Sequence, residues 1–96
     1  MNEKSQIDRL RKELDEIDEK LFELFQKRMD LIDRIAEIKK TAQLKITDES
    51  RERFIIDRAL SMSDKEYAED IILFMNSLIQ ISKKRQEKLI KEVDRG

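Results

Sequence analysis

A seven-residue repeat of apolar residues runs through the first 38 residues, and a single arginine interrupts it. The apolar positions advance by alternating steps of three and four residues, which is typical of a helix face that packs against other helices. We call this the heptad face; its apolar members are Ile7, Leu10, Leu14, Ile17, Leu21, Leu24, Leu31, Ile35 and Ile38. The interrupting residue is Arg28, and a charge buried there must be paired because unpaired burial costs several kcal/mol. The pattern therefore predicts an all-helical fold that contains an anion site.

The composition excludes much of the chemistry that enzymes use. The 96 residues include no cysteine, histidine or proline, and the only glycine is Gly96. Thiol nucleophiles, Cys/His metal sites, Ser–His pairs and glycine-rich phosphate loops are therefore ruled out. Charged residues make up 45% of the chain but nearly cancel to a formal net charge of −1, which disfavours a general nucleic-acid binder. Any anion site should be local.

We expect residues 1–96 to form one small domain, close to the lower size limit for an independent core. No apolar run approaches the ~20 residues of a membrane span. The N-terminal residues 1–12 lack the apolar centre of a signal peptide. The sequence therefore predicts a cytoplasmic protein that binds neither membranes nor nucleic acid.

The breaks in the apolar pattern predict three helices. The first covers about residues 5–40, and the second covers about residues 48–60 with Thr47 as its N-cap. The third begins near residue 64, where Ser63 and Glu66 form a capping box, and continues to about residue 92. Its apolar positions keep helical spacing and comprise Tyr67, Ile71, Met75, Leu78, Ile79, Leu89, Ile90 and Val93.

The length of the first helix predicts an oligomer. About 36 residues at ~1.5 Å each give a helix of roughly 54 Å. A compact chain of this size has a radius of gyration of only about 12–13 Å, so the other two helices cannot cover the first along its length. A second copy of the chain, related by a two-fold axis, is the usual solution.

Three cations of the first helix are candidates for the anion site. Arg28 and Lys39 differ by only about 20° around the helix axis and could hold one dianionic small molecule. Alternatively, Arg28 pairs with an internal carboxylate and Lys39 is solvated. Arg11 lies about 100° from Arg28, so it could serve the partner subunit's site, or it could simply be exposed.

Two polar pairs at a spacing of four residues are further candidates. Asp48 and Glu52 flank Arg51 at the start of the second helix, where a shared ligand would explain two like charges. Asp48 could equally complement the helix dipole while Glu52 is solvated. Ser82 and Gln86 interrupt the apolar face of the third helix; they could bind a ligand or satisfy each other and the backbone.

Taken in order along the chain, these polar residues resemble the all-helical (AroQ-type) chorismate mutases. The resemblance covers about residues 6–89 and rests on the segments Leu10-Arg11, Ile17-Asp18-Glu19-Lys20-Leu21, Lys27-Arg28, Ile38-Lys39, Asp48 with Arg51-Glu52, and Ser82 with Gln86. Proteins of that family are intertwined homodimers of three-helix protomers, in which the long first helix contributes to both active sites. The resemblance implies a single chorismate mutase type II domain that converts chorismate to prephenate in aromatic amino acid biosynthesis, the shikimate pathway.

The resemblance also implies a role for each candidate residue. Arg28 and the partner's Arg11 hold the two carboxylates of chorismate, and Ser82 lies near one of them. Glu52 and Asp48 lie near the ring hydroxyl, Arg51 arranges these acidic residues, and Lys39 and Gln86 donate to the ether oxygen. The residues expected to act in catalysis are therefore Lys39, Gln86, Arg28 and Glu52.

The implied reaction is compatible with a chain that has no cysteine and no histidine. An intramolecular rearrangement needs no nucleophile, metal or proton shuttle, so no cofactor is expected. The protein selects the chair-like conformer and stabilises negative charge that develops on the ether oxygen. Two features depart from the family pattern: Lys83 stands where an apolar residue is expected, and the connection between the second and third helices is short.

Other functions remain open from the sequence. Some relatives use a similar set of cations to eliminate pyruvate from isochorismate, although the Asp48/Glu52 pair and Gln86 favour the mutase. A non-catalytic helical dimerisation module would explain the heptads and the many charges, but not Arg28 or the Ser82/Gln86 pair. A regulatory relic that binds an aromatic amino acid is a third alternative.

Overall fold

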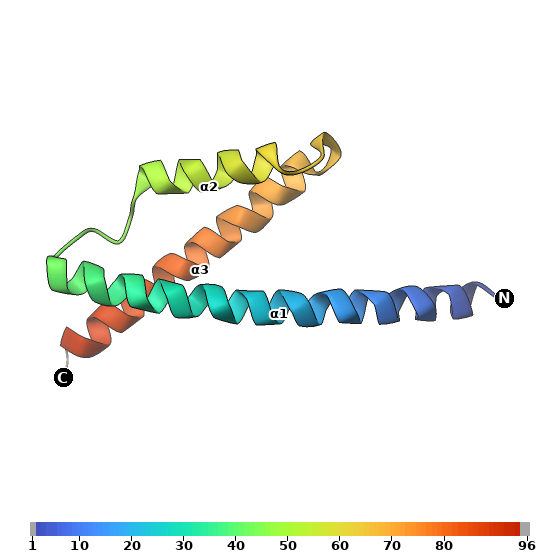
Figure 1. Ribbon diagram of the computed structural model, residues 1–96, viewed down its shortest axis with the longest axis horizontal. Helices are drawn as coiled ribbons and strands as arrows, with labels where there is room; N and C mark the ends of the chain where they lie inside the picture. Colours follow the sequence, from blue (N-terminus) through green and yellow to red (C-terminus); the bar gives the residue numbers. More distant parts are fainter. Residues whose placement is uncertain (1, 95–96) are drawn as a thin grey trace. The chain divides into compact units, whose positions relative to one another are not determined.

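The computed structural model describes the backbone of residues 2–94 and the side chains of residues 2–91. It contains α1 (Glu3–Ala42), α2 (Glu49–Ser61), the short 3₁₀ helix η1 (Lys65–Tyr67) and α3 (Ala68–Asp94), as Figure 1 shows. No strand occurs among the described residues. The predicted all-α fold with a long first helix is therefore confirmed, and α1 extends two residues beyond the predicted bounds at each end.

The chain divides into two compact units, Met1–Leu31 and Ile32–Gly96, which we call the N-terminal and C-terminal units. Helix α1 contributes to both of them. The N-terminal unit is a single helical segment, whose first turn is capped by Asn2: the Oδ1 atom accepts a hydrogen bond of 2.8 Å from the Ser5 N–H. The C-terminal unit contains the last part of α1 together with α2, η1 and α3.

The heptad face is exposed within this chain. The exposed fractions of its nine apolar residues range from 43% for Ile35 to 63% for Ile38. The buried residues of α1 are instead Met29, at 6%, and Ala36, at 1%. These two residues are seven apart and lie on the next face of the helix, so the heptad face is not the one that the chain covers by itself.

Helix α1 ends at a left-handed residue. Gln43 has a φ of 55°, and two backbone hydrogen bonds close the end of the helix around it. The Gln43 N–H donates to the Lys40 carbonyl at 3.2 Å, and the Leu44 N–H donates to the Lys39 carbonyl at 2.8 Å. This pairing is a Schellman motif, which usually places glycine at the left-handed position.

The start of α2 corrects one prediction. The N-cap is Asp48 and not Thr47, because the Asp48 Oδ1 atom accepts a 3.0 Å hydrogen bond from the Arg51 N–H. The same oxygen accepts a 2.9 Å hydrogen bond from the Ser50 hydroxyl. A carboxylate at this position also interacts favourably with the positive end of the helix dipole, which a threonine hydroxyl does not do.

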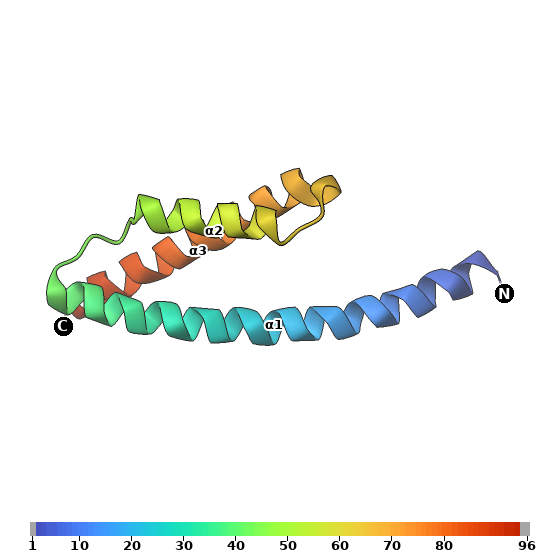
Figure 2. The same cartoon turned by 45° about the horizontal axis from the view of Figure 1, so that its top comes forward.

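The segment before α3 also differs from its prediction. The predicted capping box at Ser63 and Glu66 would begin an α-helix directly, but the chain first forms η1. The N-cap of η1 is Asp64, whose side chain makes no capping hydrogen bond, and the Tyr67 N–H donates to the Asp64 carbonyl at 3.0 Å. This i→i+3 bond winds the first turn more tightly than an α-helix. Figure 2 shows this turn joining α2 to α3.

The core of the C-terminal unit lies along α3, which packs against α2. Ile79 is buried, and the predicted apolar positions around it are half-buried: Ile71, Met75, Leu78, Leu89 and Ile90. Tyr67 is exposed, and the side chain of Val93 lies outside the described residues. Arg85 of α3 binds both carboxylate oxygens of Asp33 in α1 through two parallel hydrogen bonds. This pair joins the last part of α1 to α3.

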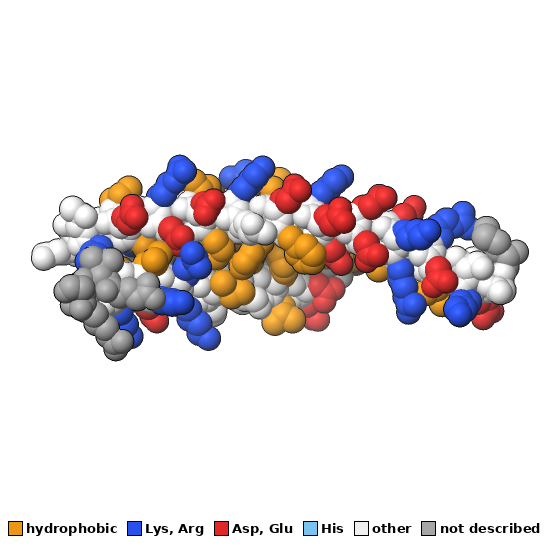
Figure 3. All heavy atoms as spheres, turned by 90° about the horizontal axis from the view of Figure 1, so that it is seen from below, with side chains coloured by type: hydrophobic (Ala, Val, Ile, Leu, Met, Phe, Trp, Pro, Cys, Tyr) orange, Lys and Arg blue, Asp and Glu red, His pale blue; other side chains and the backbone are white. Residues whose placement is uncertain are grey.

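Within residues 2–94, no helix is both long enough and apolar enough to cross a bilayer. Charged side chains cover much of the face in Figure 3, and apolar side chains reach the surface between them.

Candidate active site

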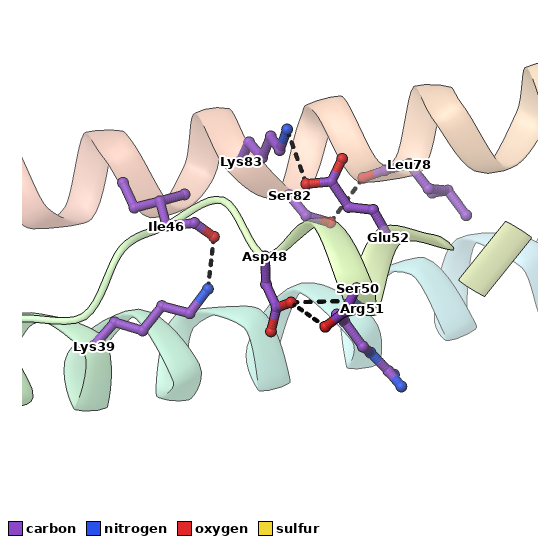
Figure 4. Close-up of polar contacts among 9 residues, drawn as sticks. All are labelled: Lys39, Ile46, Asp48, Ser50, Arg51, Glu52, Leu78, Ser82 and Lys83. Carbon is purple, nitrogen blue, oxygen red and sulfur yellow. Dashed lines mark hydrogen bonds and ion pairs between the residues drawn. The ribbon is translucent and has the colours of Figure 1, made fainter. Parts of the chain in front are cut away.

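Six of the predicted site residues belong to the C-terminal unit, and three helices position them. Lys39 lies in the last turn of α1, and Asp48, Arg51 and Glu52 form the start of α2. Ser82 and Gln86 lie one helical turn apart on α3. Figure 4 shows five of the six, with the side chains of Lys39, Asp48 and Glu52 lying close to the beginning of α2.

Lys39 is oriented towards the segment that leads into α2. Its side chain is half-buried, and the Nζ atom donates a hydrogen bond of 2.7 Å to the carbonyl of Ile46 (Figure 4). An ammonium group has three N–H donors, so this bond leaves capacity for a ligand. The backbone carbonyl of Lys39 belongs to the Schellman motif described above. The end of α1 therefore fixes both the backbone and the side chain of Lys39.

Asp48 serves first as a cap. The hydrogen bond from the Arg51 N–H, together with that from the Ser50 hydroxyl, holds the pKa of the Asp48 carboxyl below its usual value. The positive charge of Lys39 contributes a smaller lowering of the same pKa. Asp48 is thus a carboxylate at neutral pH, and it lies within electrostatic reach of Lys39. The structure gives it the helix-capping role that the sequence left open.

Glu52 forms an ion pair with Lys83 of α3. The Lys83 Nζ atom lies 2.9 Å from Glu52 Oε2, and the exposed side-chain fractions are 22% for Lys83 and 28% for Glu52. The Oε2 atom itself is buried, and the contact does not have the geometry of a directed hydrogen bond. Lys83 is the residue that departs from the family pattern, and the structure places its charge on a predicted substrate-binding carboxylate. Nothing in the sequence spacing predicted this partnership.

Ser82 and Gln86 are the most deeply buried polar residues that the structure describes, with exposed fractions of 4% and 5%. The Ser82 hydroxyl donates a 2.7 Å hydrogen bond to the Leu78 carbonyl one turn earlier. Among the described residues, no donor reaches the buried Oε1 atom of Gln86. A buried amide with an unsatisfied oxygen is costly in a stable core, so Gln86 retains hydrogen-bonding capacity of the kind that a ligand uses.

Arg51 contributes to the site through its backbone. Its N–H group donates to the carboxylate of Asp48. Its guanidinium carbon lies 5.1 Å from the centre of the Phe54 ring, a cation–π contact on an exposed part of α2. The main chain of Arg51 thus holds Asp48, and the predicted role of the Arg51 side chain in arranging the acidic residues remains a prediction.

The other two predicted site residues belong to the N-terminal unit. Arg11 is exposed, and its guanidinium lies 4.0 Å from the carboxylate of Asp8 one turn earlier. Arg28 is half-buried. Their predicted roles in binding carboxylates remain predictions.

The Arg85–Asp33 pair is a contact that sequence reasoning missed. The hydrogen bonds from Arg85 hold the pKa of Asp33 below its usual value. The two residues are 52 positions apart, and neither interrupts an apolar pattern, so the sequence carries no signal that would join them. The pair holds α3 to the last part of α1, which also carries Lys39.

The C-terminal unit thus carries a lysine of α1, two carboxylates of α2 and a buried amide of α3. Comparison with known proteins identifies the class, because the family described as chorismate mutase type II matches residues 10–87. The chain therefore belongs to the chorismate mutase type II family.

Two curated relatives illustrate this membership. A chorismate mutase of Methanocaldococcus jannaschii is 32% identical over 85 residues, which cover 86% of each chain. The bifunctional chorismate mutase/prephenate dehydratase of Aquifex aeolicus is 40% identical over 62 residues, which cover 65% of this chain. The match spans only 17% of that longer relative. No solved structure gave a significant match.

Proposed function

We propose that this chain catalyses the rearrangement of chorismate to prephenate, and that it does so as a homodimer in which both subunits contribute to each active site. The family and the chorismate mutase activity named for both relatives support this isomerase activity in aromatic amino acid biosynthesis. The observation that carries the proposal is the burial of the Gln86 amide on α3, which is 5% exposed and whose Nε2 group is a hydrogen-bond donor. Such a group is suited to meet a ligand that lies beside α3.

The reaction places few demands on the protein's own chemistry. The C–O ether bond breaks and a new C–C bond forms within one molecule, so no proton or electron needs to be supplied. Negative charge develops on the ether oxygen as the bond lengthens. Lys39 and Gln86 act as fixed donors to this oxygen, and preorganised donors of this kind are worth about 3–4 kcal/mol each.

The cations of α1 orient the substrate. Chorismate carries two carboxylates; Arg28 and the partner's Arg11 bind them, and Ser82 lies near one of them. Holding both ends of the molecule selects the chair-like conformer that can react, which is an entropic contribution to catalysis. Glu52 and Asp48 lie near the ring hydroxyl, whose single O–H donates to one of these carboxylates. Both carboxylates sit at the start of α2, where Asp48 caps the helix.

The exposed heptad face supports the homodimer. Its nine apolar residues run from Ile7 to Ile38, a distance of 31 residue steps, which corresponds to about 46 Å of helix. An apolar stripe of that length, interrupted only at Arg28, is rarely left in water. A second copy of α1 offers a surface with the same spacing and an equal length, and a two-fold axis would place Arg11 of each chain beside the other chain's site.

The direct test is product analysis with the purified chain. We expect the absorbance of chorismate to fall and prephenate to accumulate, without release of pyruvate. The Gln86→Ala variant should lose about 10²- to 10³-fold in kcat, as expected when one preorganised donor is removed. Gln80→Ala is the matched control, because Gln80 is an exposed glutamine on the same helix.

Two outcomes would contradict the proposal. Chorismate that stays intact in the presence of folded protein would exclude the mutase activity. Pyruvate released from isochorismate, with chorismate untouched, would instead support the lyase alternative. A loss of activity in Gln80→Ala equal to that in Gln86→Ala would remove Gln86 from its assigned position.

A further inference from the structure

The Lys83–Glu52 ion pair has no role in the reaction described so far. Lys83 Nζ and Glu52 Oε2 are 2.9 Å apart, and the pair bridges α3 and α2 (Figure 4). Lys83 follows Ser82 and precedes Gln86 by three residues on α3. Glu52 follows Asp48 by one helical turn on α2. The pair is therefore surrounded in the sequence by residues assigned to substrate binding.

The burial of the pair distinguishes it from an ordinary surface salt bridge. Both side chains are more than two-thirds covered, and the Glu52 oxygen that faces Lys83 is inaccessible to solvent. Exposed ion pairs contribute little because water screens them. A covered carboxylate that loses its cation is destabilising, because no water replaces the lost partner. Lys83 thus provides charge compensation that solvent cannot supply to that oxygen.

This compensation matters because the substrate is a dianion. Without Lys83, Glu52 would present an uncompensated negative charge next to a ligand that carries two more. With Lys83, the pair is neutral overall, and Glu52 can still accept a hydrogen bond through its other oxygen. The same contact limits the orientations of the Glu52 side chain.

We propose that Lys83 is a positioning residue for Glu52, and that it sets the affinity for the dianionic substrate by cancelling the charge of Glu52. This inference rests on the proposed function. It predicts that Lys83 acts on substrate binding more than on the chemical step, because it touches Glu52 and not the ether oxygen.

The first test separates KM from kcat. In Lys83→Met, KM for chorismate should rise about five- to tenfold, between the values for an exposed and a buried pair, while kcat changes less than twofold. Lys83→Arg keeps the charge and should restore most of the affinity. Lys84→Met removes a neighbouring exposed lysine and is the matched control for net charge; its KM should stay at the wild-type value.

The second test is a double-mutant cycle. Glu52→Gln in the Lys83→Met background removes the uncompensated charge, so KM should fall back towards the value of Glu52→Gln alone. An unchanged KM in folded Lys83→Met would overturn the inference. The inference would also be overturned if the KM change in the double variant equals the product of the KM changes in the two single variants, since independent residues do not couple.

Calorimetric binding of prephenate separates this inference from the proposed function. The Kd for prephenate should follow the same order, weakest in Lys83→Met and recovered in Lys83→Arg. If the Kd values follow this order but the wild-type protein does not convert chorismate, the proposed function is contradicted and the inference is retained. If the wild-type protein converts chorismate and Lys83→Met binds prephenate with the same Kd as wild type, the inference alone is contradicted. Failure of wild-type protein both to bind prephenate and to react would overturn both.

Discussion

The two units of the chain differ in what they bury. Among residues 2–31, Met29 is the only buried residue. The six apolar residues of the heptad face that precede Arg28 in the sequence are 47–61% exposed. The C-terminal unit buries Ala36, Ile79, Ser82 and Gln86, and it has ion pairs between helices. The C-terminal unit therefore has a core of its own, whereas the heptad face of the N-terminal unit is exposed and is the surface that the proposed homodimer would cover.

The same contrast applies to the candidate site. The groups assigned to the breaking bond and the ring hydroxyl lie in the C-terminal unit. The two arginines assigned to the substrate carboxylates lie in the N-terminal unit. The proposed roles therefore divide between the two units: donation to the ether oxygen is assigned to the C-terminal unit, and binding of the substrate carboxylates is assigned to the N-terminal unit.

The largest effect is expected at Gln86, which is proposed to donate to the ether oxygen. Replacing Gln86 by Glu places a carboxylate at the ether oxygen, where it cannot donate and would repel the developing charge. We expect kcat to fall about 10²-fold or more at neutral pH and to recover in part on acidification, since the protonated acid can donate. A pH–rate profile from pH 4 to 8 checks this. Wild-type rates near neutrality with a flat profile would place Gln86 outside the site.

The next effect concerns the N-terminal unit. Leu14→Glu puts a charge on the heptad face within the N-terminal unit, where a partner chain should bury leucine at a gain of about 2 kcal/mol per subunit. We expect dissociation at micromolar concentration and a lower urea midpoint, measured by sedimentation and circular dichroism. Lys12→Glu, at an exposed position outside that face, is the control. If Leu14→Glu stays as stable and associated as this control, the heptad face is not an interface.

A smaller effect tests the internal bonds of the C-terminal unit. The pKa of Asp33 is lowered by Arg85, so ionised Asp33 stabilises the fold above its unfolded pKa of about 3.8. That stability is lost as the pH falls through the lower folded value. Asp33→Asn should therefore be less stable than wild type at pH 7, and the difference should shrink towards pH 2. Urea midpoints at several pH values measure it; a constant difference would exclude this charge as the cause.

The smallest effect concerns the end of α1. Gln43 has a positive φ, which costs a side-chain residue more than glycine. Gln43→Gly should raise the free energy of unfolding by about 0.5–1 kcal/mol, measured in urea. Thr41→Gly, inside the helix, should lower it and serves as the opposite control. A destabilised Gln43→Gly would show that the Schellman motif is not what ends α1.

The helices could be predicted from the sequence because apolar spacing is a local signal. The same spacing could not say which face of α1 the chain covers. The heptad face is the more regular of the two, yet Met29 and Ala36, one position further on, are the buried residues. Which face of a helix becomes buried depends on tertiary contacts, which leave no local pattern in the sequence.

The candidate site residues remain predictions, and the pairings among them could not be predicted from the sequence. The resemblance supplied the candidate residues, and the structure shows Gln86 buried and Lys39 oriented by the Ile46 carbonyl. Asp48 and not Thr47 is the N-cap of α2. Aspartate is preferred over threonine at this position, and its carboxylate also interacts with the helix dipole. The ion pair between Lys83 and Glu52 could not be predicted, because it depends on how α2 and α3 align across the η1 turn.

Mixing of inactive variants tests the central claim, that each active site draws on two chains. Arg11→Ala and Arg28→Ala homodimers should both be nearly inactive, since each lacks one carboxylate partner in both sites. After random subunit exchange half of the dimers are mixed, and one of their two sites has both arginines intact. The mixture should therefore recover about a quarter of wild-type activity. A mixture that stays as inactive as its components, with exchange verified, would contradict the shared site.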